Sequence, residues 1–153
     1  MTQSHASEIR VQSILDDFLC KNRPSYEDLP REIREVLAQI HLSLFDLELN
    51  VRSLKSCCRI RDNNVSSRFR YLMGMTIKQY VEGLRMEAAG RLLRSDDVGI
   101  FDASIAVGYN SLQTFYRAFG RHYGCTPAEY RRTLSNIRPF SEDKKGRCAG
   151  VDA

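Results

Sequence analysis

The sequence contains no tryptophan, only four prolines and only three histidines among its 153 residues. It also has no long hydrophobic run, since no stretch approaches the ~20 apolar residues that a membrane-spanning helix requires. The amino-terminal stretch MTQSHASEIR lacks the apolar core of a secretory signal. These absences exclude an integral membrane protein and favour a protein that functions in the cytoplasm.

Residue types that carry out chemistry are sparse. His5, His41 and His122 are scattered and the five cysteines show no C-x-x-C spacing, so no metal site is predicted. There is no Ser–His–Asp order, paired carboxylate motif or glycine-rich phosphate loop, and we expect no enzymatic activity, catalytic residue or cofactor. Cys57 and Cys58 lie in an apolar helical pattern that is typical of buried free thiols, with a redox sensor as the alternative.

Positive charge is unevenly distributed along the chain. Residues 1–45 hold 5 Lys/Arg and 7 Asp/Glu, whereas residues 46–132 hold 14 and 9, a net charge of +5. Such a local excess is expected where phosphate groups are bound. It is also common on surfaces that bind no nucleic acid, so it supports an assignment without making one.

Helical periodicity is strongest between residues 100 and 131. Apolar or small residues recur on one face of residues 100–107, and Gly108 then permits the left-handed conformation that ends a helix sharply. Asn110 or Ser111 can cap a second helix. The second helix has a predicted buried face of Phe115, Ala118 and Phe119 and a predicted exposed face of Gln113, Thr114, Tyr116 and Arg117. Two short helices joined by a turn with glycine form a helix-turn-helix.

Other segments also predict helices, so the expected fold is all-α. Residues 50–73 form an earlier helix pair, in which Asn50 caps the first helix and Asp62 or Asn63 caps the second. Capping boxes at Thr76 and Thr126 open two further helices. The expected buried side chains of the first pair are Val51, Leu54, Cys57 and Cys58, followed by Val65, Phe69 and Leu72.

The segment 100–131 resembles the second helix-turn-helix of the AraC/XylS family of bacterial transcription regulators. Residues that carry the resemblance are Ile100, Ala106, Gly108, Tyr109, Ser111, Phe115, Arg117, Phe119, Gly124, Thr126, Pro127, Tyr130 and Arg131. The long helix that precedes it is similar to the connecting helix of the family through Tyr80, Arg85, Ala89, Leu92 and Leu93. The resemblance extends over about residues 35–132.

This resemblance implies two homeodomain-like helix-turn-helix subdomains, at about residues 50–73 and 99–121, joined by a connecting helix at about 76–94. A helix of ~18 residues is ~27 Å long. It can therefore hold two reading helices one DNA turn apart, in successive major grooves of double-stranded DNA. Residues 35–132 form the implied DNA-binding domain, residues 1–34 a helical extension, and residues 133–153 a flexible tail.

The first helix pair departs from the pattern of the family at four positions. Lys55 stands in place of the usual alanine, Arg59 in place of the turn glycine, and Arg61 in place of a serine cap. Ser67 replaces a long basic residue on the reading helix. If Arg59 must adopt a positive φ, the cost is about 1 kcal/mol. These departures leave open an alternative function, a protein-interaction module with a degenerate first unit.

The residues expected to contact bases lie on the two reading helices. Gln113 and Arg117 are one helical turn apart, and their side chains suit adenine and guanine edges respectively. Leu112 either packs on a thymine methyl group or is partly buried. Asn63, Asn64 and Ser67 are the corresponding candidates on the first reading helix.

A second set of basic residues has positioning or structural roles. Lys78, Arg121 and Arg131, near helix ends, are expected to contact phosphates, with surface ion pairs as the alternative. Arg85 lies among apolar residues, so we expect a structural role and a carboxylate partner, for which Asp102 is available.

The remaining segments concern the possible binding partners of the protein. The helix predicted at residues 7–21, with Ile9, Ile14 and Phe18, either packs on the bundle or pairs with another protein. No effector-binding domain is evident, as in the small stand-alone members of the family. Contact with RNA polymerase is the usual mode of activation in the family, and repression is also known. The oligomeric state, target promoters and sign of regulation do not follow from the sequence.

Overall fold

The computed structural model describes residues 2–23, 25–61 and 64–137, with only the backbone for residues 2–4. The described residues form eight α-helices and no strand, which confirms the all-α prediction. The helices are α1 (Thr2–Lys21), α2 (Arg31–Leu42), α3 (Val51–Cys57), α4 (Val65–Met73), α5 (Ile77–Leu92), α6 (Ile100–Ala106), α7 (Leu112–Tyr123) and α8 (Pro127–Ile137). None of these helices is long and apolar enough to cross a membrane.

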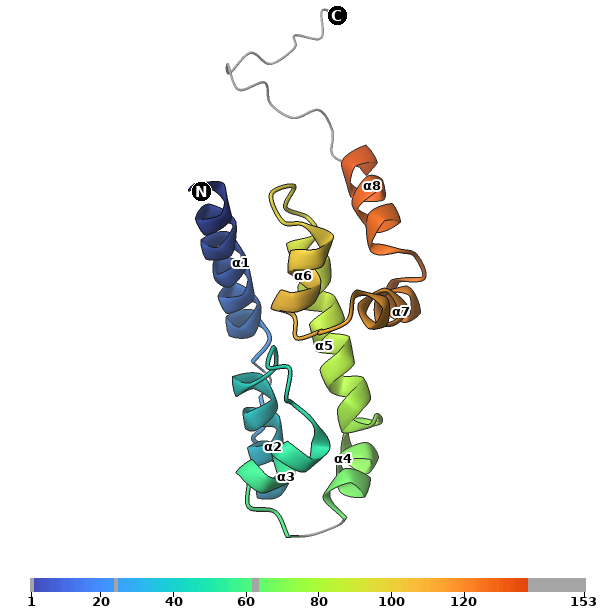
Figure 1. Ribbon diagram of the computed structural model, residues 1–153. Coiled ribbons are helices and arrows are strands. Elements are labelled where there is room, and N and C mark those ends of the chain that lie inside the picture. Colours follow the sequence, from blue (N-terminus) through green and yellow to red (C-terminus); the bar gives the residue numbers. More distant parts are fainter. Residues whose placement is uncertain (1, 24, 62–63, 138–153) are drawn as a thin grey trace, which may run out of the picture.

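The connecting helix α5 runs between two groups of helices (Figure 1). Helices α2, α3 and α4 surround its amino-terminal end, and α6, α7 and α8 lie towards its carboxyl-terminal end. The α1 helix packs along α5. Helices α3 and α4 form the first helix-turn-helix unit and α6 and α7 form the second, in the order that the sequence predicted.

Side-chain caps mark the start of four of the eight described helices. Asn50 accepts a hydrogen bond from the backbone N–H of Ser53 at 2.9 Å, which confirms its predicted capping role. The predicted capping boxes at Thr76 and Thr126 are both formed, with Gln79 and Glu129 as their reciprocal partners. At the start of α7 the cap is Ser111 rather than Asn110.

Left-handed residues end several helices. Gly74 and Gly124 follow α4 and α7 with φ of 71° and 72°, and Gly108 follows α6 with φ of 89°. Arg59, in the turn of the first unit, has φ of 52° and is the non-glycine residue with positive φ among those described. The left-handed turn is therefore kept where the family has glycine, as the strain argument anticipated.

Four helix boundaries differ from the predicted ones. The α4 helix begins at Val65, one or two residues later than a cap at Asp62 or Asn63 would give, and both of those residues lie outside the described ranges. Helices α2 and α5 end at Leu42 and Leu92, whereas the sequence pattern predicted that they end at about Phe45 and Arg94. The α8 helix continues to Ile137, so residues 133–137 belong to a helix; the rest of the predicted tail lies outside the described residues.

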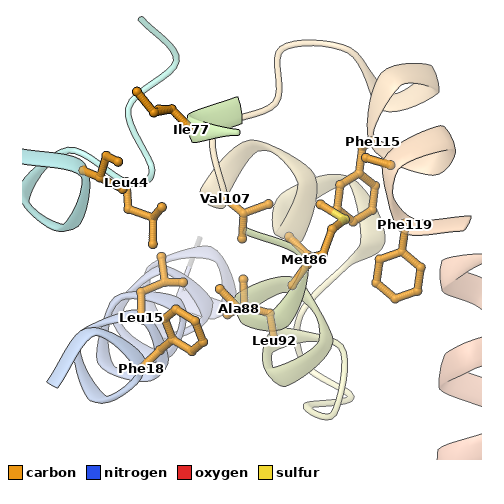
Figure 2. Packing of buried hydrophobic residues seen from close by; sticks show 14 of the residues in the cluster. Leu15, Phe18, Leu44, Ile77, Met86, Ala88, Leu92, Val107, Phe115 and Phe119 are labelled. Atoms are coloured by element: carbon orange, nitrogen blue, oxygen red, sulfur yellow. The ribbon is translucent and has the colours of Figure 1, made fainter. Parts of the chain in front are cut away.

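The hydrophobic core extends across both units and includes α1. Leu15 and Phe18 of α1 are buried, and Figure 2 shows them facing Ala88 and Leu92 of α5. The guanidinium of Arg91 lies 4.8 Å from the centre of the Phe18 ring. Of the two roles left open for the amino-terminal segment, the structure therefore has α1 packed on the bundle.

Three apolar residues expected to be buried are exposed. Ile9 is 59% exposed and Leu72 42% exposed, and Cys57 is exposed as well. For Leu72 and Cys57, the buried stripe passes through the next position in the sequence. Phe69 is followed by Met73, four residues on, rather than by Leu72, and Leu54 is followed by Cys58 rather than by Cys57.

Candidate nucleic-acid interface

The apolar and polar residues of α7 lie on opposite faces of the helix. Phe115, Ala118 and Phe119 are fully buried, and the two phenylalanine rings lie 5.7 Å apart between centroids. The opposite face leaves Gln113, Thr114 and Arg117 exposed, as predicted. Tyr116 is half-buried against Phe115, so the polar face is narrower than the sequence indicated.

Gln113 and Arg117 share the exposed face of α7, because residues four apart lie one above the other on a helix. Leu112, at the first position of α7, is 39% exposed and lies beside them at the entrance of the helix. Two polar groups suited to base edges and one apolar side chain are therefore brought together on one surface. This is the arrangement that a major-groove reading helix requires.

The corresponding face of α4 is built differently. Ser67 is exposed, and Asn64 is exposed at the position before the helix; Asn63 lies outside the described residues. Arg70 and Tyr71, which follow Ser67 by three and four positions, share its face, and the side chain of Tyr71 is 87% exposed. Sequence reasoning missed both residues, although their spacing from Ser67 was a sufficient signal.

The three arginine and lysine residues expected to contact phosphates have different surroundings. Lys78 is exposed in the first turn of α5. Arg121 is exposed and donates to Glu82 of α5 at 2.8 Å, and this hydrogen bond raises the pKa of its guanidinium. Lys78 and Arg121 lie on the same groove between the two units.

Arg131 does not join Lys78 and Arg121. It is half-buried, and its guanidinium donates to the backbone carbonyls of Leu93 and Val98 in the turn between α5 and α6. This contact ties α8 to the turn that precedes α6. Its hydrogen bonds serve the packing of the second unit, which makes it a poor candidate for a phosphate contact.

Arg85 is buried, but its expected partner was wrong. Its guanidinium donates to the backbone carbonyls of Leu44 at 2.8 Å and Asp46 at 2.6 Å, and to that of Gly108 at 3.2 Å. Asp102 is exposed on α6. Backbone carbonyls at the ends of helices and turns replace the carboxylate, because they too are strong acceptors that need a donor when buried.

The position of Arg85 links the two units. Leu44 and Asp46 precede α3 of the first unit, whereas Gly108 lies in the turn of the second. A Cβ atom at Gly108 would lie 2.9 Å from the carbonyl oxygen of Phe45 and 3.0 Å from the Arg85 guanidinium. The second turn is therefore packed directly on the first unit at a position that only glycine fits.

The other chemistry-bearing groups of the described residues form no metal site. In the described ranges, no group of three or more His, Cys, Asp or Glu residues is placed to hold a metal ion. Burial raises the pKa of the Cys58 thiol, which favours the unreactive protonated form of that thiol.

Comparisons with known proteins agree with this architecture. A model of the helix-turn-helix domain matches residues 57–133, half of the chain. The melibiose operon regulatory protein of Escherichia coli K12 is 28% identical over 94 residues, which cover 61% of this chain and 31% of that protein. The transcriptional activator RhaR of Mannheimia succiniciproducens is 37% identical over 81 residues, 51% of this chain and 29% of the activator.

A solved structure shows the same fold. The C-terminal domain of AraT, a response regulator from Geobacillus stearothermophilus, superposes with a TM-score of 0.67 at 26% identity, covering 75% of this chain and 92% of that domain. The described fold, with exposed faces on α4 and α7, thus defines a tandem helix-turn-helix protein. The chain belongs to the AraC/XylS family of helix-turn-helix proteins. It spans less than a third of the length of the two regulators named above.

Proposed function

We propose that this chain is a sequence-specific regulator of transcription that binds double-stranded DNA through α4 and α7. The observation that supports this most directly is that α4 and α7 each have an exposed polar face. The connecting helix α5 runs between the two units that contain them (Figure 1). The α5 helix has 16 residues, which correspond to about 24 Å. That length suits the placement of two reading helices in successive major grooves on one side of the duplex.

Each exposed residue of α7 has a proposed role. Arg117 donates to O6 and N7 of guanine, Gln113 pairs with N6 and N7 of adenine, and Leu112 packs on a thymine methyl group. At the start of α4, Asn64 and Ser67 contribute fewer base contacts, and Arg70 extends the face of Ser67. Asn63, which lies outside the described residues, belongs to the same set of proposed contacts. Lys78 and Arg121 contact phosphates and fix the position of the protein on the duplex.

The alternative, a protein-interaction module with a degenerate first unit, is not favoured. It rested on four departures from the family pattern, and for one of them, the loss of the turn glycine, Arg59 adopts the left-handed conformation and α3 and α4 form around it. Under the proposed function the DNA-binding domain comprises residues 35 to 137, including all of α8. We propose cytoplasmic localisation, regulation through contact with RNA polymerase, and no enzymatic activity.

The salt dependence of DNA binding tests this function. If Lys78, Arg121 and neighbouring basic groups neutralise about 4 to 6 phosphates, log K should fall against log salt with a slope of about −4 to −5. Fluorescence anisotropy with a labelled duplex, titrated from low to moderate salt, measures that slope. An affinity that stays flat over this range would contradict DNA binding as the main function.

A further inference from the structure

A groove lies between the two helix-turn-helix units, along the amino-terminal half of α5. Its free volume is about 320 Å³, at the lower end of the range of about 300–1,000 Å³ that is typical of ligand pockets. The first unit contributes one wall and the second unit the other, with α5 between them. The lining residues are Leu49, Asn50, Val51, Leu54, Ile77, Lys78, Val81, Glu82, Arg85, Tyr109, Thr114 and Arg121.

Half of this lining is apolar. Leu54 and Ile77 are buried, and Leu49, Val51 and Val81 are partly buried against the same core. The Tyr109 ring packs 5.7 Å from the Phe115 ring, edge to face, and completes the apolar part. A DNA backbone would leave these groups in contact with water or phosphate, whereas a compact hydrocarbon body would cover them.

The polar part of the lining is cationic. It carries three cations, Lys78, Arg85 and Arg121, and one carboxylate, Glu82. Arg121 is paired with Glu82 at 2.8 Å, while Lys78 forms no ion pair with any other residue of the described ranges. Arg85 is held by three carbonyls and contributes its positive charge without being free to move.

The protonation state of Tyr109 is consistent with a cationic groove. Burial, and then Glu82, raise its pKa to about 12. The phenol is therefore neutral at physiological pH, and it adds no negative charge to the groove. A net charge of +2 remains around an apolar surface that both units share.

We propose that this groove binds a small amphipathic carboxylate. The carboxylate lies between Lys78 and Arg121, and the hydrocarbon body contacts Val51, Val81 and Tyr109. Charge-assisted hydrogen bonds to the two cations account for the preference for an anion, and the apolar lining accounts for the preference for a compact body over an inorganic ion. The sequence had given no sign of such a site, because its residues come from segments far apart in the chain.

Occupancy of the groove has a consequence for DNA, which rests on the proposed function. Lys78 and Arg121 are also the proposed phosphate contacts, and each cation cannot serve a phosphate and the ligand fully at the same time. The ligand should therefore weaken DNA binding. Ligand binding itself is measured without DNA, so the two proposals can fail separately.

The test uses the full chain with 3-phenylpropanoate and its neutral isostere 3-phenylpropanamide. Isothermal titration calorimetry should show the anion binding about tenfold more tightly than the amide, the effect of one charge-assisted hydrogen bond. In a ¹H–¹⁵N spectrum, the amides of Val51, Val81 and Tyr109 should shift together. Equal affinities for the two compounds, or shifts confined to other residues, would overturn the proposal.

Variants separate this site from nonspecific attraction. The double variant Lys78→Gln/Arg121→Gln should weaken binding of the anion at least about tenfold, whereas Arg132→Gln, an exposed change of the same kind on α8, should not. Val81→Trp should fill the groove and abolish binding while both cations remain. If Lys78→Gln weakens DNA binding but neither compound binds the unmodified chain, the groove serves phosphates alone and the proposal is wrong.

Discussion

Arg59 and Arg85 show how single residues determine the geometry of the turns. Arg59 lies in the turn between α3 and α4 with φ of 52°, a conformation that costs a residue with a Cβ atom about 1–2 kcal/mol. Arg85 lies on α5 and satisfies three backbone carbonyls from both units. Arg59 therefore introduces backbone strain, whereas Arg85 stabilises the arrangement of the two units.

The strain at Arg59 can be removed by one substitution. Arg59→Gly should raise the free energy of unfolding by about 0.5–1 kcal/mol, because glycine adopts positive φ without a steric cost but loses more entropy on folding. Urea denaturation of the full chain measures the change. The matched control is Arg61→Gly, which is exposed and carries no positive φ and should be neutral or destabilising. Equal destabilisation by both substitutions would show that the turn is not strained.

The partners of Arg85 are tested by a pair of variants. Arg85→Met should lower the free energy of unfolding by at least about 3 kcal/mol, since it leaves three carbonyls without a charged donor. Asp102→Asn should change it by less than about 0.5 kcal/mol, because Asp102 is exposed and makes no contact with Arg85. Thermal or urea unfolding distinguishes the two. A large effect of Asp102→Asn would restore the ion pair that the sequence suggested.

Among the elements, α1 contacts regions far apart in the fold, as the connecting helix α5 does. Phe18 packs on α5 and lies 6.4 Å from the Phe45 ring, beside the first unit. Near the middle of α1, Arg10 forms an ion pair at 3.2 Å with Asp97, in the turn before the second unit. The helix thus packs along α5 and reaches both the segment before the first unit and the turn before the second.

The contribution of α1 can be measured by two substitutions within it. Phe18→Ala should destabilise the chain by about 3–5 kcal/mol, because it opens a cavity at a fully buried position. Ile9→Ala, at a position that is 59% exposed, should change stability by less than about 0.5 kcal/mol. If the two variants unfold at the same denaturant concentration, α1 does not contribute to the core and serves a partner instead.

The elements also show which parts of the structure a sequence can predict. Capping boxes at Thr76 and Thr126 and the glycines that follow α4, α6 and α7 are local signals, and the helices begin or end there. The choice between Leu72 and Met73, or between Cys57 and Cys58, depends on the angle at which each helix packs. That angle depends on helices far away in the sequence. The hydrophobic pattern of one short segment therefore could not predict which of two adjacent residues is buried.

The candidate site was predictable to a similar degree. The exposed positions of Gln113 and Arg117 follow from the period of α7 alone. The structural role of Arg85 was also predicted, but the hydrogen-bond partners of Arg85 and Arg131 were not, because their acceptors are backbone carbonyls tens of residues away. Backbone acceptors cannot be recognised in a sequence, because every residue has one. A carboxylate such as Asp102 can be recognised, which is why Asp102 was wrongly predicted as the partner of Arg85.

At the scale of the whole molecule, the two units are not equivalent. The face of α7 combines a long amide, a guanidinium and an exposed leucine, whereas the face of α4 presents Ser67 where α7 has Arg117. A short hydroxyl offers at most one adaptable hydrogen bond, while arginine can bind guanine through two. Sequence specificity should therefore be concentrated on the half-site beneath α7.

The most direct test of DNA reading by this protein compares Arg117→Ala with Ser67→Ala on two duplexes. One carries a site selected from a random library by the unmodified chain, and the other carries the same bases scrambled. Arg117→Ala should cost about 1–3 kcal/mol on the selected site and relax the base preference beneath it, with little change on the scrambled duplex. Ser67→Ala should cost much less, with folding of both variants verified by circular dichroism. A larger loss for Ser67→Ala on the selected site, or an equal loss for Arg117→Ala on both duplexes, would contradict base reading by α7.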